Sequence, residues 1–105
     1  MQIERYDSEH RYRYVAWDDF GSRIIGTAVV ERRAGELVLD RISVTRVSRG
    51  NGVGTTMLTR ILGDFIGEDI VVYSFRSRVG WYLRHGFESE GRHGSLVKMR
   101  RRSRE

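Results

Sequence analysis

Hydrophobic and polar residues alternate along much of the first part of the chain, which predicts β-strands. In Arg11–Trp17, basic residues alternate with apolar or aromatic ones, and a period of two places each set on one face of a strand. Arg23–Arg33 and Glu36–Val44 are rich in apolar and β-branched residues, with a tight turn at Gly35 between them. We therefore predict an antiparallel meander of three strands, with Ile3–Tyr6 as a short additional edge strand.

The pattern becomes helical from Thr55 onward. A stripe of apolar residues recurs at the spacing of one buried helix face, and Gly67 is suited to the C′ position that ends such a helix. The residues of the stripe are Met57, Leu58, Ile61, Leu62 and Phe65. We predict one helix here, packed against the meander.

The last third of the chain predicts a strand, a short helix and a closing pair of strands. Asp69–Phe75 is a short apolar run typical of a strand inside a sheet. Arg78–Gly86 reads as a helix that Gly86 stops, and the two final strands flank a turn around Gly91–Gly94. The order β-β-β-α-β-α-β-β predicts a single α/β (α+β) domain over residues 1–105, with one helix crossing between neighbouring strands.

Composition narrows the class of protein. A chain of 105 residues has room for one domain, and 39% hydrophobic and 31% charged residues are usual for a globular protein. No apolar stretch approaches the ~18 residues of a membrane span. There are no cysteines, and no cluster of His, Asp and Glu has ligand spacing, so we expect no metal. These features favour a cytoplasmic protein that does not associate with membranes.

The net charge of +5 favours an anionic partner, such as nucleic acid, an acidic protein or a phosphorylated cofactor. Part of the excess lies in residues 98–105, a basic C-terminal tail with the sequence KMRRRSRE. We interpret this tail as a solvated, frayed end. A nucleic-acid arm is not favoured, because no aromatic residue follows Met99 among the basic ones.

Three glycines at the start of the predicted first helix suggest a phosphate site. Gly50, Gly52 and Gly54 follow Arg49. The first N–H groups of a helix have no partner within it and attract anions, and glycines allow both close approach and positive φ. The spacing differs from those of the P-loop and the dinucleotide fingerprint. Taken alone, it favours a sharp turn with no ligand.

Two blocks together resemble a known family. Arg49-Gly50-Asn51-Gly52-Val53-Gly54 matches R/Q-x-x-G-x-G/A, and Trp81–Phe87, WYLRHGF, looks like Tyr-x-x-x-Gly-Phe. In this order, with a strand and helix between them, they resemble the GNAT superfamily of N-acetyltransferases, whose first block is the acetyl-CoA pyrophosphate loop. The final LVKMRR is similar to the family's closing strand.

The resemblance implies acetyl-CoA as co-substrate. In the family, the strand before the loop splays from its neighbour and pairs with the pantetheine arm, while the helix N-terminus holds the pyrophosphate. The residues implied are Ile42, Ser43 and Val44 on the strand, and Arg49, Gly50, Asn51, Gly52, Val53, Gly54 and Thr55 in the loop and helix. Arg76 and Arg78 are either close to the 3′-phosphate or simply solvated.

The resemblance also implies catalytic residues. Tyr82 occupies the family's usual position for the proton donor to the departing thiolate; the alternative is a ring that only packs beside Trp81. Asp40 is a candidate base, because strict alternation would place it on the face of Ile42 and Val44. An equally good interpretation makes Asp40 a paired surface charge.

The chain departs from the family at its N-terminal part, where only turns separate the predicted strands. Most members have one or two helices there, which shape the acceptor pocket. An open site suits a protein lysine or another exposed primary amine, and we predict N-acetyl transfer to such a group. The alternative is a non-catalytic module that binds acetyl-CoA, protein or nucleic acid. Tyr12, Tyr14 and Trp17 either serve a homodimer or form the buried face of the meander.

Overall fold

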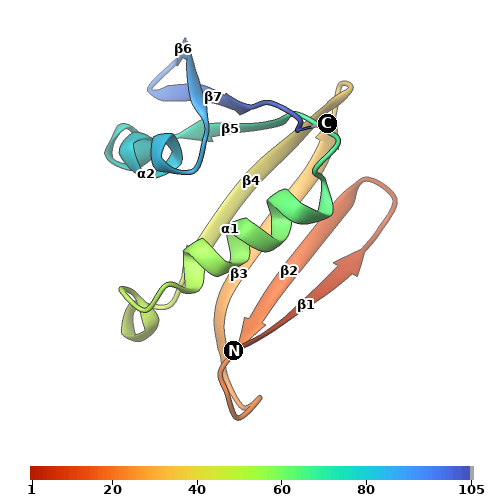
Figure 1. Ribbon diagram of the computed structural model, residues 1–105, viewed down its shortest axis with the longest axis vertical. Helices are drawn as coiled ribbons and strands as arrows, with labels where there is room; N and C mark the ends of the chain where they lie inside the picture. The colour runs from red at the N-terminus through yellow and green to blue at the C-terminus, as the bar shows by residue number, and fades with distance from the viewer. Residues whose placement is uncertain (105) are drawn as a thin grey trace.

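The fold is built on one seven-stranded sheet, described by a computed structural model over residues 1–104. The strand order is β1-β2-β3-β4-β5-β7-β6, and only β4 and β5 pair in parallel (Figure 1). The strands are β1 Gln2–Asp7, β2 Arg11–Trp17, β3 Ile24–Arg33, β4 Glu36–Val44, β5 Ile70–Ser74, β6 Glu88–His93 and β7 Leu96–Arg101. The helices are α1 Val53–Asp64 and α2 Val79–Arg84, each preceded by a short 3-10 turn, η1 Arg46–Ser48 and η2 Arg76–Arg78. The expected mixed, mostly antiparallel sheet with two helices is confirmed.

Strands β1 to β4 form the expected meander, and within residues 1–104 no helix precedes α1. The alternation in β2 is confirmed, because Tyr14 and Ala16 are completely buried while Arg11 and Arg13 are exposed. Tyr14 therefore belongs to the buried face of the meander. None of the described helices is both long and apolar enough to cross a membrane.

Helix α1 covers the meander with the predicted apolar stripe. Met57, Leu58 and Ile61 are fully buried against the sheet. The helix ends at Asp64, so the prediction that Gly67 ends it is wrong. Phe65 leaves the helical conformation, with φ −119° and ψ 36°, and its ring packs edge-on against Tyr12 with 5.0 Å between centroids. The ring is buried, as the apolar stripe predicts, but Phe65 itself lies one residue beyond the helix.

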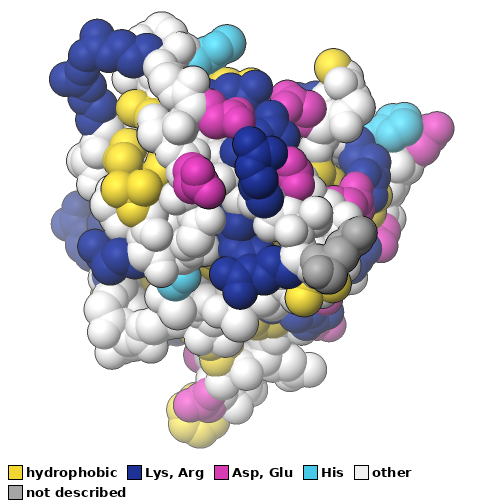
Figure 2. Space-filling view, turned by 45° about the horizontal axis from the view of Figure 1, so that its top comes forward, with side chains coloured by type: hydrophobic (Ala, Val, Ile, Leu, Met, Phe, Trp, Pro, Cys, Tyr) yellow, Lys and Arg dark blue, Asp and Glu magenta, His cyan; other side chains and the backbone are white. Residues whose placement is uncertain are grey.

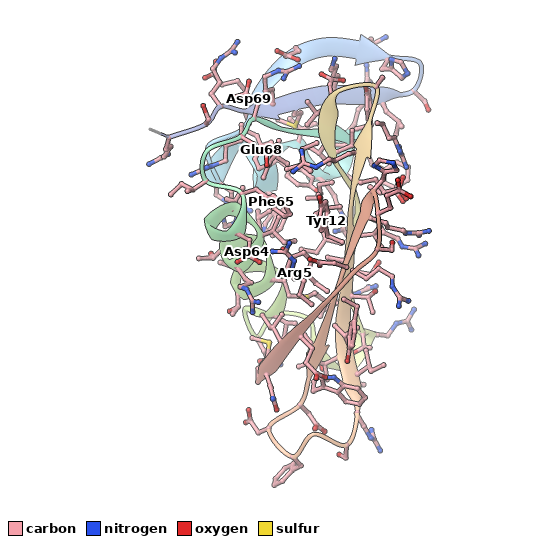
Figure 3. All side chains as sticks on the ribbon, turned by 90° about the vertical axis from the view of Figure 1, so that its right-hand side faces the viewer. Arg5, Tyr12, Asp64, Phe65, Glu68 and Asp69 are labelled. Atoms are coloured by element: carbon pink, nitrogen blue, oxygen red, sulfur yellow. The ribbon has the colours of Figure 1, made fainter. Side chains whose placement is uncertain are left out.

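Both helices lie on the same face of the sheet, since residues of α1 and α2 share one hydrophobic core. In Figure 3, α1 stands on one side of the sheet and side chains project freely from the other. Val29, Val38 and Val71 are nevertheless buried without being part of that core. We infer that the aliphatic stems of long charged side chains cover them, as such stems commonly cover apolar surface.

The C-terminal residues correct another prediction. Lys98–Arg101 belong to β7, an inner strand between β5 and β6, which confirms the closing strand predicted at LVKMRR and makes the interpretation of the same stretch as a frayed tail wrong. Met99 is completely buried, and Arg100 pairs with Glu36, Glu90 and Asp69. Figure 2 shows Lys and Arg interleaved with Asp and Glu on the end of the molecule where β6 and β7 lie. Glu105, also part of the expected tail, lies outside the described residues.

The turn between the last two strands also differs from the expectation. It is formed by Gly94 and Ser95 alone, whereas Gly91 lies inside β6, where the pairing with β7 skips a residue. Gly91 has φ +110°, a conformation open mainly to glycine. Gly91, which the sequence analysis placed in the turn, therefore forms part of a β-bulge.

The end of α1 is tied to the first two strands by an ionic cluster around Asp64 (Figure 3). The Tyr14 hydroxyl donates to Asp64 Oδ2 over 2.7 Å, and the guanidinium groups of Arg60 and Arg5 also donate to this carboxylate. Burial, followed by the Asp64 contact, raises the pKa of Tyr14. Burial alone would raise the pKa of Asp64, but the three donors outweigh it and lower the pKa.

Substitution of Gly26 tests how closely α1 approaches β3. A Cβ atom there would lie 2.8 Å from Met57 Sδ and 3.2 Å from both Ser43 O and Val53 Cγ1. We expect Gly26→Ala to lower the free energy of unfolding by about 1–3 kcal/mol in urea titrations, because the helix must move. Gly63→Ala is the matched control: nothing lies within 4 Å of its Cβ position, so helix propensity should stabilise the protein by up to about 1 kcal/mol. Similar effects of both changes would contradict this packing.

Acidification tests the Asp64 cluster. A carboxylate with a lowered folded-state pKa stabilises the fold at pH values above its unfolded pKa of about 3.9, and this contribution disappears as pH falls through the folded pKa. Asp64→Asn should therefore cost about 1–3 kcal/mol at pH 7 and reduce the further loss of stability below about pH 4. Urea titrations between pH 7 and pH 2 measure both effects. Glu9→Gln, at an exposed side chain, is the control; an unchanged pH profile in Asp64→Asn would refute the assignment.

Candidate active site

The site begins where β4 and β5 part. They pair only at Leu37↔Ile70, Val38↔Val71 and Leu39↔Val72, although β4 continues to Val44. Asp40 is an extra residue in β4, because Leu39 pairs with Val30 and Arg41 already with Val29. Such a bulge bends a strand and increases its twist. Beyond Leu39, therefore, β4 presents its backbone edge to an opening instead of to β5.

A pocket of about 420 Å³ occupies this opening. Its walls come from the end of β4, from the glycine loop with the first turn of α1, and from the start of α2. The lining residues are Ile42, Val44, Ser48, Arg49, Gly50, Gly52, Val53, Gly54, Thr55, Ser77, Arg78 and Trp81. The structure thus brings together the expected cofactor residues except Ser43 and Asn51, whose exposed side chains do not line the pocket.

The three glycines have different roles. Gly50 has φ +85° and Gly52, the N-cap of α1, has φ +78°, so both serve the backbone turn. Gly54 is helical, and a Cβ atom there would lie 3.6 Å from both Trp81 and Val44, which line the pocket. No side chain caps α1, and its first turn contains no acidic residue. The first N–H groups of α1 are thus left for a ligand, and the site fits a phosphate.

The charge of the pocket is positive. Arg49 and Arg78 are the charged residues among those that line it, and no carboxylate is among them. The Arg49 Nε donates to the carbonyl oxygen of Val44 over 3.1 Å, which fastens the glycine loop to the end of β4. Together with the positive end of the α1 dipole, these two arginines favour an anionic ligand.

Tyr82 lies on α2 behind Trp81 and is only 4% exposed. Its ring packs edge-on against Trp81 and Phe87, at centroid distances of 5.0 and 5.3 Å. Burial raises the pKa of Tyr82, and the Arg78 guanidinium opposes this only in part. In residues 1–104, its hydroxyl makes no hydrogen bond and is not among the buried atoms left without a partner. A protonated, accessible hydroxyl is compatible with the expected proton donor, which stays a prediction.

Asp40 does not lie where strict alternation would place it. The bulge turns Leu39 before it and Ile42 after it toward the helices, so the expectation that Asp40 shares the face of Ile42 and Val44 is wrong. Asp40 is exposed on the opposite face, where it accepts a hydrogen bond from Arg33 over 2.8 Å. It lines a depression of about 460 Å³ together with Glu36, Tyr73, His93 and other residues.

The structure also separates the two arginines that the sequence left open. Arg78 lines the pocket, whereas Arg76 lines a different depression beside Arg92. Trp81 and Ser77 line the pocket and were not foreseen. Their sequence signal is weak: Trp81 directly precedes Tyr82 on α2, and Ser77 lies in the short turn η2 before that helix.

Comparison with known proteins identifies the family. The family described as Acetyltransferase (GNAT) domain matches residues 9–89. The chain belongs to the GNAT acetyltransferase family. No curated protein matches it.

Solved structures of GNAT proteins share the fold. The histone acetyltransferase HPA2 and related acetyltransferase from Corynebacterium glutamicum is 21% identical, with a TM-score of 0.80 over 91% of this chain and 66% of that one. PaiA N-acetyltransferase from Thermoplasma acidophilum, solved in complex with coenzyme A, is 21% identical. Its TM-score is 0.75, over 89% of this chain and 61% of that one. Tetrahymena GCN5 is 15% identical, with a TM-score of 0.76 over 92% of this chain and 71% of that one. The chain thus spans less than two thirds of the length of the first two.

Proposed function

We propose that this GNAT protein transfers an acetyl group from acetyl-CoA to a primary amine. The main support for this proposal is that the free edge of β4 and the uncapped N-terminus of α1 line the same positively charged pocket. An extended, amide-containing arm can pair with the strand edge, while its phosphates bind at the helix. Coenzyme A thioesters combine these two features.

Each part of the site has a chemical role in this proposal. Backbone groups of Ile42, Ser43 and Val44 pair with the pantetheine arm, and the N–H groups of Val53, Gly54 and Thr55 bind the pyrophosphate. Acetyl-CoA supplies the activated acetyl group as a thioester. The neutral amine attacks the thioester carbonyl, the carbon–sulfur bond breaks, and the departing thiolate takes a proton from Tyr82. The proton that the nitrogen loses as the amide forms returns to the Tyr82 oxygen.

The acceptor amine approaches, in this proposal, from the face of the sheet that no described helix covers. The depression there contains two carboxylates, Glu36 and Asp40, and two rings, Tyr73 and His93, whose centroids are 4.8 Å apart. Arg33 also lines the depression and pairs with Asp40, while Arg100 pairs with Glu36. The two rings can bind a cationic amine that displaces these arginines, and an uncovered face leaves room for a large acceptor. We therefore propose a protein lysine or another exposed amine, with Asp40 as the base that takes the ammonium proton in exchange for its contact with Arg33.

A charge in the first turn of α1 tests cofactor binding. Thr55 is exposed and lines the pocket. Glu at this position suits the helix dipole but repels phosphate, so Thr55→Glu should weaken acetyl-CoA binding at least tenfold in calorimetry without lowering the melting temperature. Thr59→Glu is the matched control, because Thr59 lies one turn further along α1, on another depression. If the wild type fails to bind acetyl-CoA, the proposed function is refuted.

Removal of one hydroxyl tests the proton donor. Tyr82→Phe should lower turnover about 10²–10⁴-fold, as is typical for loss of a general acid, and leave acetyl-CoA affinity nearly unchanged. Thiol release measures turnover with lysine peptides and with small amines as acceptors. Tyr6→Phe, far from the pocket on β1, is the control. Equal turnover in Tyr82→Phe would exclude this role, and binding without turnover on any amine would favour the non-catalytic alternative.

A further inference from the structure

Arg78 stands on the wall of the pocket that faces the glycine loop. It is the last residue of η2 and the N-cap of α2, where its backbone N–H donates to the Phe75 carbonyl over 3.0 Å. Residues three apart on a helix lie on one side of it, so Arg78 and Trp81 share a side, and both line the pocket. The start of α2 therefore positions a cation at the pocket.

The distance across the pocket is short at this point. The Trp81 Cζ2 atom would lie 3.6 Å from a Cβ atom on Gly54, in the first turn of α1. Arg78, three residues before Trp81, lines the same pocket as the first turn of α1. Two positive groups, the helix N-terminus and a guanidinium, converge on one space without a lining carboxylate between them.

Several arginines of the protein are held by carboxylates. Arg32 pairs with Glu68, and Arg100 with Glu36. Arg78 makes no ion pair with any carboxylate in residues 1–104, and no side-chain hydrogen bond there. A guanidinium that lines a pocket without a protein partner is suited to the planar, two-point binding of a phosphate.

We propose that Arg78 is a cofactor-binding residue that contacts a phosphate of coenzyme A from the side opposite to the glycine loop. This inference rests on the proposed function, because it assumes that the pocket takes coenzyme A. The shared chemistry is a phosphate, which is either the pyrophosphate or the 3′-phosphate of the cofactor. Arg76, in the same 3-10 turn but on another depression, has no such contact.

Calorimetry with three ligands tests the proposal: coenzyme A, dephospho-coenzyme A, which lacks the 3′-phosphate, and pantetheine, which lacks all phosphates. Arg78→Gln should weaken coenzyme A binding at least tenfold, as expected for loss of a charge-assisted hydrogen bond. Arg76→Gln removes the same charge from the same turn and should change the affinity less than twofold. Arg78→Lys, which keeps the charge, should recover part of the loss and shows that the position tolerates substitution.

The ligands distinguish the two sources of phosphate. If the loss in Arg78→Gln persists with dephospho-coenzyme A, the contact is with the pyrophosphate; if it vanishes, the contact is with the 3′-phosphate. Salt gives an independent readout, because the affinity of the wild type should fall more steeply with sodium chloride than that of Arg78→Gln. Equal affinities of the two proteins for coenzyme A, an equal loss on pantetheine, or equal salt slopes would overturn the proposal. Failure of the wild type to bind coenzyme A would instead refute the proposed function.

Discussion

The parting of β4 from β5 after three paired residues is the constraint on which the site depends. Every other neighbouring pair of strands stays together over most of its length, and only this parallel pair opens. The extra residue in β4, Asp40, shifts the register against β3 at the same level as the opening. The bulge therefore has two consequences at once: it frees a strand edge for a ligand and turns Asp40 to the uncovered face.

The opening is useful only because α1 begins beside it. Gly26 allows α1 to approach β3 closely enough that Met57 and Val53 would contact any larger residue there. At the other end of the helix, the Asp64 cluster ties α1 to β1 and β2. The two attachments fix the direction of the helix axis, and with it the position of the N–H groups that face the pocket. A residue as far from the pocket as Asp64 thus contributes to the geometry of the site.

The charged side chains of the pocket and those of the rest of the surface are arranged differently. On the uncovered face and at the β6–β7 end, arginines pair with carboxylates. In the pocket, Arg49 and Arg78 face no lining carboxylate. The large excess of basic residues therefore has two separate uses, a salt-bridged cover for the sheet and a positive pocket, and the net charge by itself reveals neither.

Local pattern was sufficient for much of this protein. The period-two alternation in β2, the helical stripe of α1 and the glycines Gly50 and Gly52 predicted the strands, the helix and the turn before it, because each depends on residues close together in the chain. Long-range contacts decided the rest. Asp40 lies on the face opposite to the expected one because the β3–β4 register includes a bulge, and Gly91 lies in a bulge instead of a turn because of how β6 pairs with β7. Whether Arg76 or Arg78 lines the pocket likewise depends on how α2 packs against α1, and the periodicity of the sequence does not predict that packing.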